Sequence, residues 1–298
     1  MKALKRFTWV ELLVVVVVLA LSTLSLTCIT NTAREKSRRI QCANQLHTLA
    51  RSIYMYECEY KDQCPVVWPS GTEGSFGKGL YNRRNGTEIT RWCNPQFQDW
   101  AKQPTVGGCL YLLVIYEEAD PKDFVCPGAK KDKPMDFNVA KEVARQHGWE
   151  VKDWKDLRDF QSLVNLSYSY NDPWSALIDA IAPADLAILA DKSWAYDTET
   201  GERNEKAGDF PVPNSDGSWN NAQGQNIRHG NSGNHGTDYQ NILFADGHVR
   251  TCEVPTVGFR NDNIYTYWSG ETDSDQKKIG RWDQGHAKKK REDSYLGN

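Results

Sequence analysis

The sequence of 298 residues predicts an α+β fold, in which a long N-terminal helix packs on a C-terminal antiparallel β-sheet with long loops. Three observations lead to this prediction. An apolar run occupies residues 7–29, an amphipathic pattern follows without a helix breaker over residues 30–61, and short apolar runs bounded by turn residues recur over residues 62–275. A basic leader, residues 1–6, and a polar tail, residues 276–298, complete the chain.

The apolar run is long enough to cross a bilayer. From Trp9 to Ile29 an α-helix would rise about 1.5 Å per residue and cover roughly 30 Å, which is one hydrocarbon thickness. A cleaved secretory signal fits less well, because no small-residue cleavage site precedes an abrupt change to globular sequence. One carboxylate, Glu11, lies within the run. A charged side chain at membrane depth is rare and costly, so Glu11 is a candidate functional residue.

The amphipathic pattern continues the same helix beyond the membrane. Its apolar residues recur mostly three or four positions apart, and they include Ile40, Ala43, Leu46, Ala50, Ile53 and Tyr60. Since no Gly or Pro interrupts the chain before Pro65, we expect a single helix of about fifty residues. Its first half would lie in lipid, and its second half would pack against the globular domain.

The N-terminal stretch KRFTWVELLVV resembles the start of type IV pilin-like proteins and of the pseudopilins of type II secretion. Those proteins have a short basic leader and then Phe-Thr-x-x-Glu at the start of an apolar helix. The resemblance implies that a prepilin peptidase cleaves between Arg6 and Phe7 and that Phe7 becomes the methylated N-terminus. It also implies that Glu11 meets the N-terminal ammonium of a neighbouring subunit during assembly. The family usually has Gly where this chain has Arg6. The alternative for Glu11 is a side chain that extends to the cytoplasmic interface.

Short segments of the globular part predict its helices and strands. Residues 109–118 form a buried apolar run that fits either a short helix or a strand. The periodicity of residues 136–147 predicts a helix, whereas the runs 166–170 and 186–190 predict strands. Residues 193–226 are polar and without periodicity, so they predict a loop.

The strongest local signal of the globular part is the stretch NILFADGHVRTCEV, residues 241–254. Asp246 and Gly247 lie between two β-rich runs and predict a two-residue type I′ hairpin turn, in which both residues have positive φ. In that register Phe244 faces Val249 across the hairpin.

Two elements of the globular part resemble a large family of pilin-like proteins, which occurs in bacteria that have many paralogues of this family. That family carries a C-terminal His-x9-Asp-Gly signature, which corresponds here to His235, Asp246 and Gly247, followed by His248. Ten residues rather than nine separate His235 from Asp246 in this chain. The stretch Phe124-Val125-Cys126-Pro127 resembles a Phe-x-Cys-Pro element of the same family.

The chain has eight cysteines, and none of their spacings gives a CxxC pair, so the sequence gives poor support to a tetrahedral zinc site. If the globular domain faces an oxidising compartment, we expect at least one disulfide among the cysteines after residue 50. A Cys58–Cys64 bridge would close a short loop at the end of the helix. The other candidates are Cys93, Cys109, Cys126 and Cys252.

His229, His235, Asp246 and His248 lie close together in the sequence and are candidates for a metal site. Asp246 is already explained as a turn residue, however, and we expect the histidines to be ordinary hydrogen-bonded side chains. A structural or a catalytic metal is the minor alternative. We therefore predict no metal, no cofactor and no catalytic residue. The Asp/Asn-rich stretch 260–275 is a weak candidate for Ca²⁺, because it lacks a regular ligand spacing.

Composition and resemblance together define the expected partners. A net charge of −3 and a pI near 6.1 argue against nucleic acid. Ten of the eleven tryptophans follow residue 60, which makes carbohydrate a candidate partner. The resemblance implies a single-pass inner-membrane protein with a cytoplasmic N-terminus and a periplasmic, extracytoplasmic globular domain. Its partners would be the membrane, a prepilin peptidase and identical or related subunits.

The expected function is structural: a pilin-like or pseudopilin subunit of a type IV pilus or type II secretion filament, without enzymatic activity. An alternative is a membrane-anchored extracytoplasmic binding protein, for polysaccharide or another ligand, that forms no filament. A third reading is an anchored metal-dependent hydrolase.

Overall fold

The computed structural model describes residues 9–60, 63–67, 105–116, 118–171, 173, 182–192, 231–259, 263–265 and 296–297. The α-helices are α1 (Trp9–Glu59), α3 (Val106–Ile115) and α4 (Phe137–Gln146). Short 3₁₀ helices are η2 (Pro121–Phe124), η3 (Trp154–Asp156), η4 (Leu163–Asn165) and η7 (Gly233–His235). The strands are β1 (Tyr168–Asn171), β2 (Ala187–Asp191), β3 (Gln240–Phe244), β4 (Val249–Cys252) and β5 (Leu296–Gly297).

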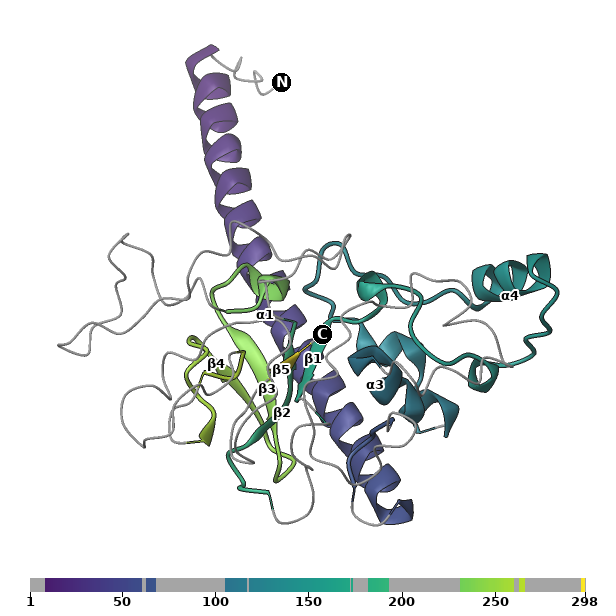
Figure 1. Cartoon of the computed structure of the whole chain (residues 1–298). Helices are drawn as coiled ribbons and strands as arrows, with labels where there is room; N and C mark the ends of the chain where they lie inside the picture. Colours follow the sequence, from purple (N-terminus) through teal and green to yellow (C-terminus); the bar gives the residue numbers. More distant parts are fainter. Residues whose placement is uncertain are drawn as a thin grey trace, which may run out of the picture.

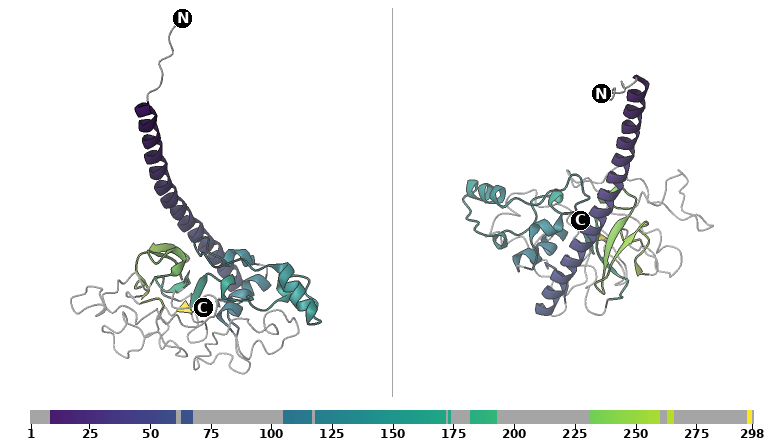
Figure 2. Two further views of the ribbon diagram at one scale, coloured as in Figure 1. Left: turned by 90° about the horizontal axis from the view of Figure 1, so that it is seen from above. Right: turned by 180° about the vertical axis from the view of Figure 1, so that it is seen from behind.

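Helix α1 is continuous over 51 residues, as the absence of Gly and Pro predicts. Its N-terminal part stands out from the other described elements, and its C-terminal part runs along them (Figures 1 and 2). The buried stripe repeats at alternating steps of four and three residues through Cys42, Leu46, Leu49, Ile53 and Tyr56. The observed stripe is therefore rotated slightly about the helix axis relative to the predicted stripe. Leu46 and Ile53 belong to both, whereas the predicted Ile40 is 55% exposed.

The five strands form one sheet in the order β4-β3-β2-β1-β5, and every neighbouring pair is antiparallel. The predicted strands 166–170 and 186–190 correspond to β1 and β2, and the predicted helix 136–147 to α4. The run 109–118, which fits a helix or a strand, forms helix α3. Strand β5 comes from the segment taken as a polar tail, and it completes one edge of the sheet beside β1.

The strands β1, β2 and β3 are buried on both faces of the sheet, whereas the edge strand β4 is largely exposed. One core cluster joins α1, α3 and one face of the sheet, and it includes Leu46, Leu110, Phe124, Tyr168 and Leu243. A second cluster covers the opposite face and includes Ile242, Phe244, Ile264, Tyr265 and Leu296. Every residue of β2 and β3 is buried, which explains why both strands are rich in apolar residues without the alternation of a half-exposed strand.

The hairpin between β3 and β4 has a three-residue loop, not the predicted two-residue one. Leu243 pairs with Val249, and the Gly247 N–H donates to the Phe244 carbonyl at 2.9 Å. Gly247 has a φ of 85°, as predicted, but Asp246 does not have a positive φ. The loop is therefore a type I turn followed by a left-handed glycine, and the type I′ prediction with Phe244 opposite Val249 is wrong. One additional loop residue shifts the whole register.

The structure confirms the coarse prediction of an α+β fold with an antiparallel sheet. The expected membrane-spanning segment, residues 7–29, lies only partly within the described residues. Among the described residues, no helix combines the length and the hydropathy that a bilayer crossing needs.

Candidate functional site

The first candidate site is the outer half of α1. Every described side chain from Trp9 to Ser22 is exposed, including Trp9 at 80%, Leu12 at 51% and Leu19 at 58%. Glu11 lies within this exposed apolar stretch. The expected cleavage site, Arg6 and Phe7, lies outside the described residues.

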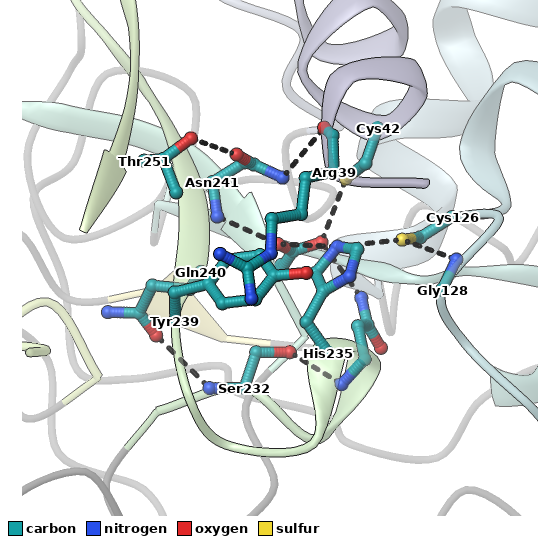
Figure 3. A network of polar contacts seen from close by, with 12 residues as sticks. Arg39, Cys42, Cys126, Gly128, Ser232, His235, Tyr239, Gln240, Asn241 and Thr251 are labelled. Carbon is teal, nitrogen blue, oxygen red and sulfur yellow. Dashed lines mark hydrogen bonds and ion pairs between the residues drawn. The ribbon is translucent and has the colours of Figure 1, made fainter. Parts of the chain in front are cut away.

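The second candidate site is a buried cluster where three distant parts of the chain meet the inner half of α1 (Figure 3). Cys42 comes from α1, and Cys126 follows η2. Asp191 is the last residue of β2, and His235 is the last residue of η7. All four residues are buried, and one potential ligand atom of each lies within 4.8 Å of the others. Among the described residues, these four form the one group of three or more histidine, cysteine or carboxylate side chains that lie close enough together to hold a metal ion.

The contacts within this Cys42–Cys126–Asp191–His235 cluster are short. The Cys42 thiol donates to Asp191 Oδ1 at 3.1 Å. His235 Nε2 lies 3.4 Å from Cys126 Sγ and 3.5 Å from Asp191 Oδ2. The imidazole nitrogen thus faces a sulfur and a carboxylate oxygen at once.

The other ring nitrogen of His235 is held by Glu35 of α1. Nδ1 lies 3.2 Å from Glu35 Oε1, which also accepts a hydrogen bond from the Tyr239 hydroxyl at 2.8 Å. The Tyr239 ring stacks on the imidazole with centroids 4.8 Å apart. A Cβ atom at Gly128 would lie 2.5 Å from the His235 ring, so this close approach requires glycine. These contacts fix the position and orientation of the imidazole.

Asp191 is fully buried, and a buried carboxylate needs hydrogen bonds and compensating charge. Besides Cys42, it accepts from the Asn234 side chain at 3.0 Å and from the Asn241 backbone N–H at 2.8 Å. Cys126 Sγ in turn accepts from the Gly128 N–H at 3.2 Å. Every member of the cluster therefore has a defined partner.

The cluster shifts the protonation of its own members. Burial opposes the charged form of His235, but the hydrogen bond with Cys126 and the charge of Asp191 outweigh burial and raise its pKa to about 9. The contact with Cys42 lowers the pKa of Cys126. Burial raises the pKa of Cys42, which keeps its proton and donates it to Asp191. The two cysteines thus play different roles.

A buried ion pair adjoins the cluster. Lys192, which follows Asp191 in the chain, lies 2.7 Å from Asp132, and both side chains are almost inaccessible to solvent. Lys192 also donates to the Leu166 carbonyl at 2.9 Å, and the Ser167 hydroxyl donates to Asp132 at 2.6 Å. Burial lowers the pKa of Lys192, although Asp132 counteracts this. The pair fixes the end of β2, where the cluster begins.

The structure separates the histidines that the sequence groups together. Asp246 and His248 contact one another on the exposed hairpin, and the His248 ring stacks on Phe244 at 4.5 Å between centroids. His235 belongs to the buried cluster instead, where its ring nitrogens contact Cys126, Asp191 and Glu35. His229 and most of the Ca²⁺ candidate stretch 260–275 lie outside the described residues.

The cysteines after residue 50 are free thiols wherever the structure describes them. The Cys58–Cys64 bridge is not formed, and Cys64 donates to Glu57 Oε1 at 2.8 Å instead. Cys58 is exposed, whereas Cys64, Cys109, Cys126 and Cys252 are buried. Cys93 lies outside the described residues.

A cavity of about 480 Å³ borders the inner half of α1. Its walls come from the helix, from β2 and from the β3–β4 hairpin. They combine charged with apolar side chains, including His47, Arg51, Glu57, Ile188, Leu243 and Asp246. Such a mixture suits a small amphipathic ligand.

Comparisons with models of protein families, with curated proteins and with solved structures found no match to this chain.

Proposed function

We propose that the chain is a structural subunit of the pilin or pseudopilin type, which is anchored in a membrane by α1 and assembles through it. The observation that carries this proposal is the division of one continuous helix into two environments. The side chains from Trp9 to Ser22 are exposed, whereas the stripe from Cys42 to Tyr56 is buried against the globular part. The N-terminal part of the helix projects away from the other described elements (Figure 2).

The outer half of α1 is apolar on all sides. Val14, Val15, Val16, Val17 and Val18 are each between 45% and 58% exposed, although they point in different directions around the helix. A helix that is apolar all round is typical of a segment buried in lipid or among other helices. A continuous exposed apolar surface of this kind marks a membrane or protein contact. Both contacts are required of a subunit that is stored in a membrane and then assembled.

Glu11 gives this surface a specific partner. Within lipid or a helix bundle a charged carboxylate is unfavourable unless an opposite charge compensates it. The ammonium of a neighbouring subunit, processed at Phe7, would supply that charge. Such a pair would fix the axial position of one α1 against the next.

The cavity beside α1 supports a second candidate, an anchored binding protein that forms no filament. Arg51 and Glu57 would provide its polar contacts, and Ile188 and Leu243 its apolar ones. This candidate needs no processing of the N-terminus and no contact between copies.

Two measurements on membranes of cells that make the full chain test the proposal. Mass spectrometry identifies the mature N-terminus, and chemical cross-linking measures oligomers of wild type, Glu11→Val and Glu59→Val. The last is a matched control, since it makes the same change at an exposed position near the other end of the same helix. We expect a methylated Phe7 and a loss of oligomers in Glu11→Val alone. An intact Met1 with equal oligomer yields in all three chains would contradict assembly and favour the binding protein.

A further inference from the structure

We propose that Cys42, Cys126, Asp191 and His235 form a closed structural zinc site, which fastens α1 to the globular domain. The proposal rests on the buried cluster alone and is independent of filament assembly. It departs from the expectation of no metal, which followed from the absence of paired cysteines in the sequence.

The donor atoms suit zinc in kind and in spacing. Thiolate, imidazole and carboxylate are the groups that bind zinc in proteins, with the metal about 2.3 Å from sulfur and about 2.0–2.2 Å from nitrogen or oxygen. In a tetrahedral site neighbouring donor atoms therefore lie roughly 3.3–3.8 Å apart. The separations are 3.1 Å from Cys42 Sγ to Asp191 Oδ1, 3.4 Å from His235 Nε2 to Cys126 Sγ and 3.5 Å from His235 Nε2 to Asp191 Oδ2. One donor atom of each residue lies within 4.8 Å of the other three, so a contraction of the longer separations would bring the four donors to tetrahedral spacing.

The surroundings of the donors are those of a metal site. A ligating histidine usually donates its other N–H to a carboxylate, and Glu35 lies 3.2 Å from His235 Nδ1. With the Nδ1–H donated to Glu35, loss of the Nε2 proton on zinc binding would direct the Nε2 lone pair at the cluster. The Gly128 N–H stabilises Cys126 sulfur, and the Asn234 and Asn241 donors orient the Asp191 carboxylate. Outer contacts of this kind orient ligands and raise metal affinity.

Charge also favours a cation here. With both cysteines ionised and Asp191 charged, the cluster would hold three negative charges away from water, and zinc would compensate two of them. Lys192 is already paired with Asp132, at 2.7 Å. A divalent ion is thus the natural counter-charge for the ionised cluster.

The arrangement supports a structural role and gives no support to a hydrolase. Catalytic zinc sites use three protein ligands and leave the fourth position to water, whereas structural sites are closed by four. Here four protein ligands are present, and the His235 and Asp191 side chains are inaccessible to solvent. The ion would join α1 to β2, to η7 and to the segment after η2. It would hold the helix near the point where it leaves the globular domain, between its exposed and buried halves (Figures 1 and 3).

The test uses the full-length protein, purified in detergent under reducing conditions. Bound zinc is measured by elemental analysis, removed with a chelator and replaced by one equivalent of Co²⁺. Tetrahedral Co²⁺ with thiolate ligands has intense visible bands and an ultraviolet charge-transfer band. Cys42→Ser and His235→Ala are compared with the matched controls Cys58→Ser and His248→Ala, whose side chains are exposed.

We expect one zinc per chain, the tetrahedral cobalt spectrum, and loss of both in the two cluster variants but in neither control. Glu35→Gln, which alters a partly exposed residue outside the ligand set, should keep the fold and weaken zinc binding about 10–100-fold. This variant keeps the test decisive if a ligand variant fails to fold. A wild-type protein that shows no tetrahedral cobalt spectrum would overturn the proposal. A Cys42–Cys126 disulfide, mapped in protein isolated without reductant, would overturn it as well, because it would consume two ligands.

Discussion

The two halves of α1 are equally helical and both rich in apolar residues, yet they have opposite environments. In the outer half, apolar residues surround the helix and are exposed. In the inner half one stripe of apolar residues is buried by the sheet and α3, whereas Ile40, Tyr54 and Met55 lie outside it and are exposed. The difference shows that the spacing of apolar residues along a helix indicates its environment better than the number of apolar residues does. A one-sided stripe indicates packing within the chain, whereas an all-round pattern indicates packing against lipid or other chains.

The largest difference between the halves should appear in stability. Leu49 is fully buried in the stripe, so Leu49→Ala should lower the free energy of unfolding of the globular part by about 2–5 kcal/mol. Val15→Ala, the matched truncation in the outer half, should change it by less than about 0.5 kcal/mol. Denaturant titration in detergent, followed by tryptophan fluorescence, measures both values. Equal effects would show that the division of the helix is wrong.

The hairpin beside the inner half should be nearly as sensitive. Gly247 has a φ of 85°, which a β-branched residue adopts only with strain, so Gly247→Val should destabilise the protein by about 1–3 kcal/mol. Gly247→Asn is the control, since asparagine tolerates the left-handed region and should cost much less. Thermal melts of both variants give the comparison. A valine variant as stable as the asparagine variant would contradict the observed turn.

A smaller effect is expected where the cluster meets the inner half. Gly128→Ala places a methyl group against the His235 ring, and we expect a loss of about 1–2 kcal/mol because the ring must move. In the double variant with His235→Ala the conflict with the ring disappears and only the contact with the Asn234 carbonyl oxygen, at 2.8 Å, remains. The two single losses should therefore sum to more than the loss in the double variant. Strict additivity in chemical denaturation would exclude the close contact.

The sequence was sufficient for the parts of the fold that depend on neighbouring residues. The uninterrupted helix, the helix at residues 136–147 and the buried strands all follow from local pattern, and the structure confirms them. The hairpin register was wrong because two-residue and three-residue loops share the Asp-Gly signal, and only pairing across the strands distinguishes them. Local pattern thus predicts elements better than register.

The buried cluster lay beyond such reasoning. Cys126 and His235 each belong to a sequence element that resembles the pilin-like family. Their partners carry no such signal, because Cys42 is one position on the buried stripe of α1 and Asp191 is the last residue of β2. The four residues come together only through the packing of α1 on the sheet. Ligands that are dispersed in this way have no characteristic spacing in the sequence. The proposed zinc site can therefore be recognised only in the folded structure.

We propose that the outer half of α1 contacts other copies of the chain, whereas the inner half packs against the globular part of its own chain. A photo-reactive amino acid, p-benzoylphenylalanine, is placed at Val16 or at Thr48, both exposed positions on the same helix, and cell membranes are irradiated. We predict covalent dimers from position 16, few from position 48, and a strong reduction at position 16 when Glu11→Val is added. Equal dimer yields at the two positions, or a yield at position 16 that does not depend on Glu11, would contradict the claim.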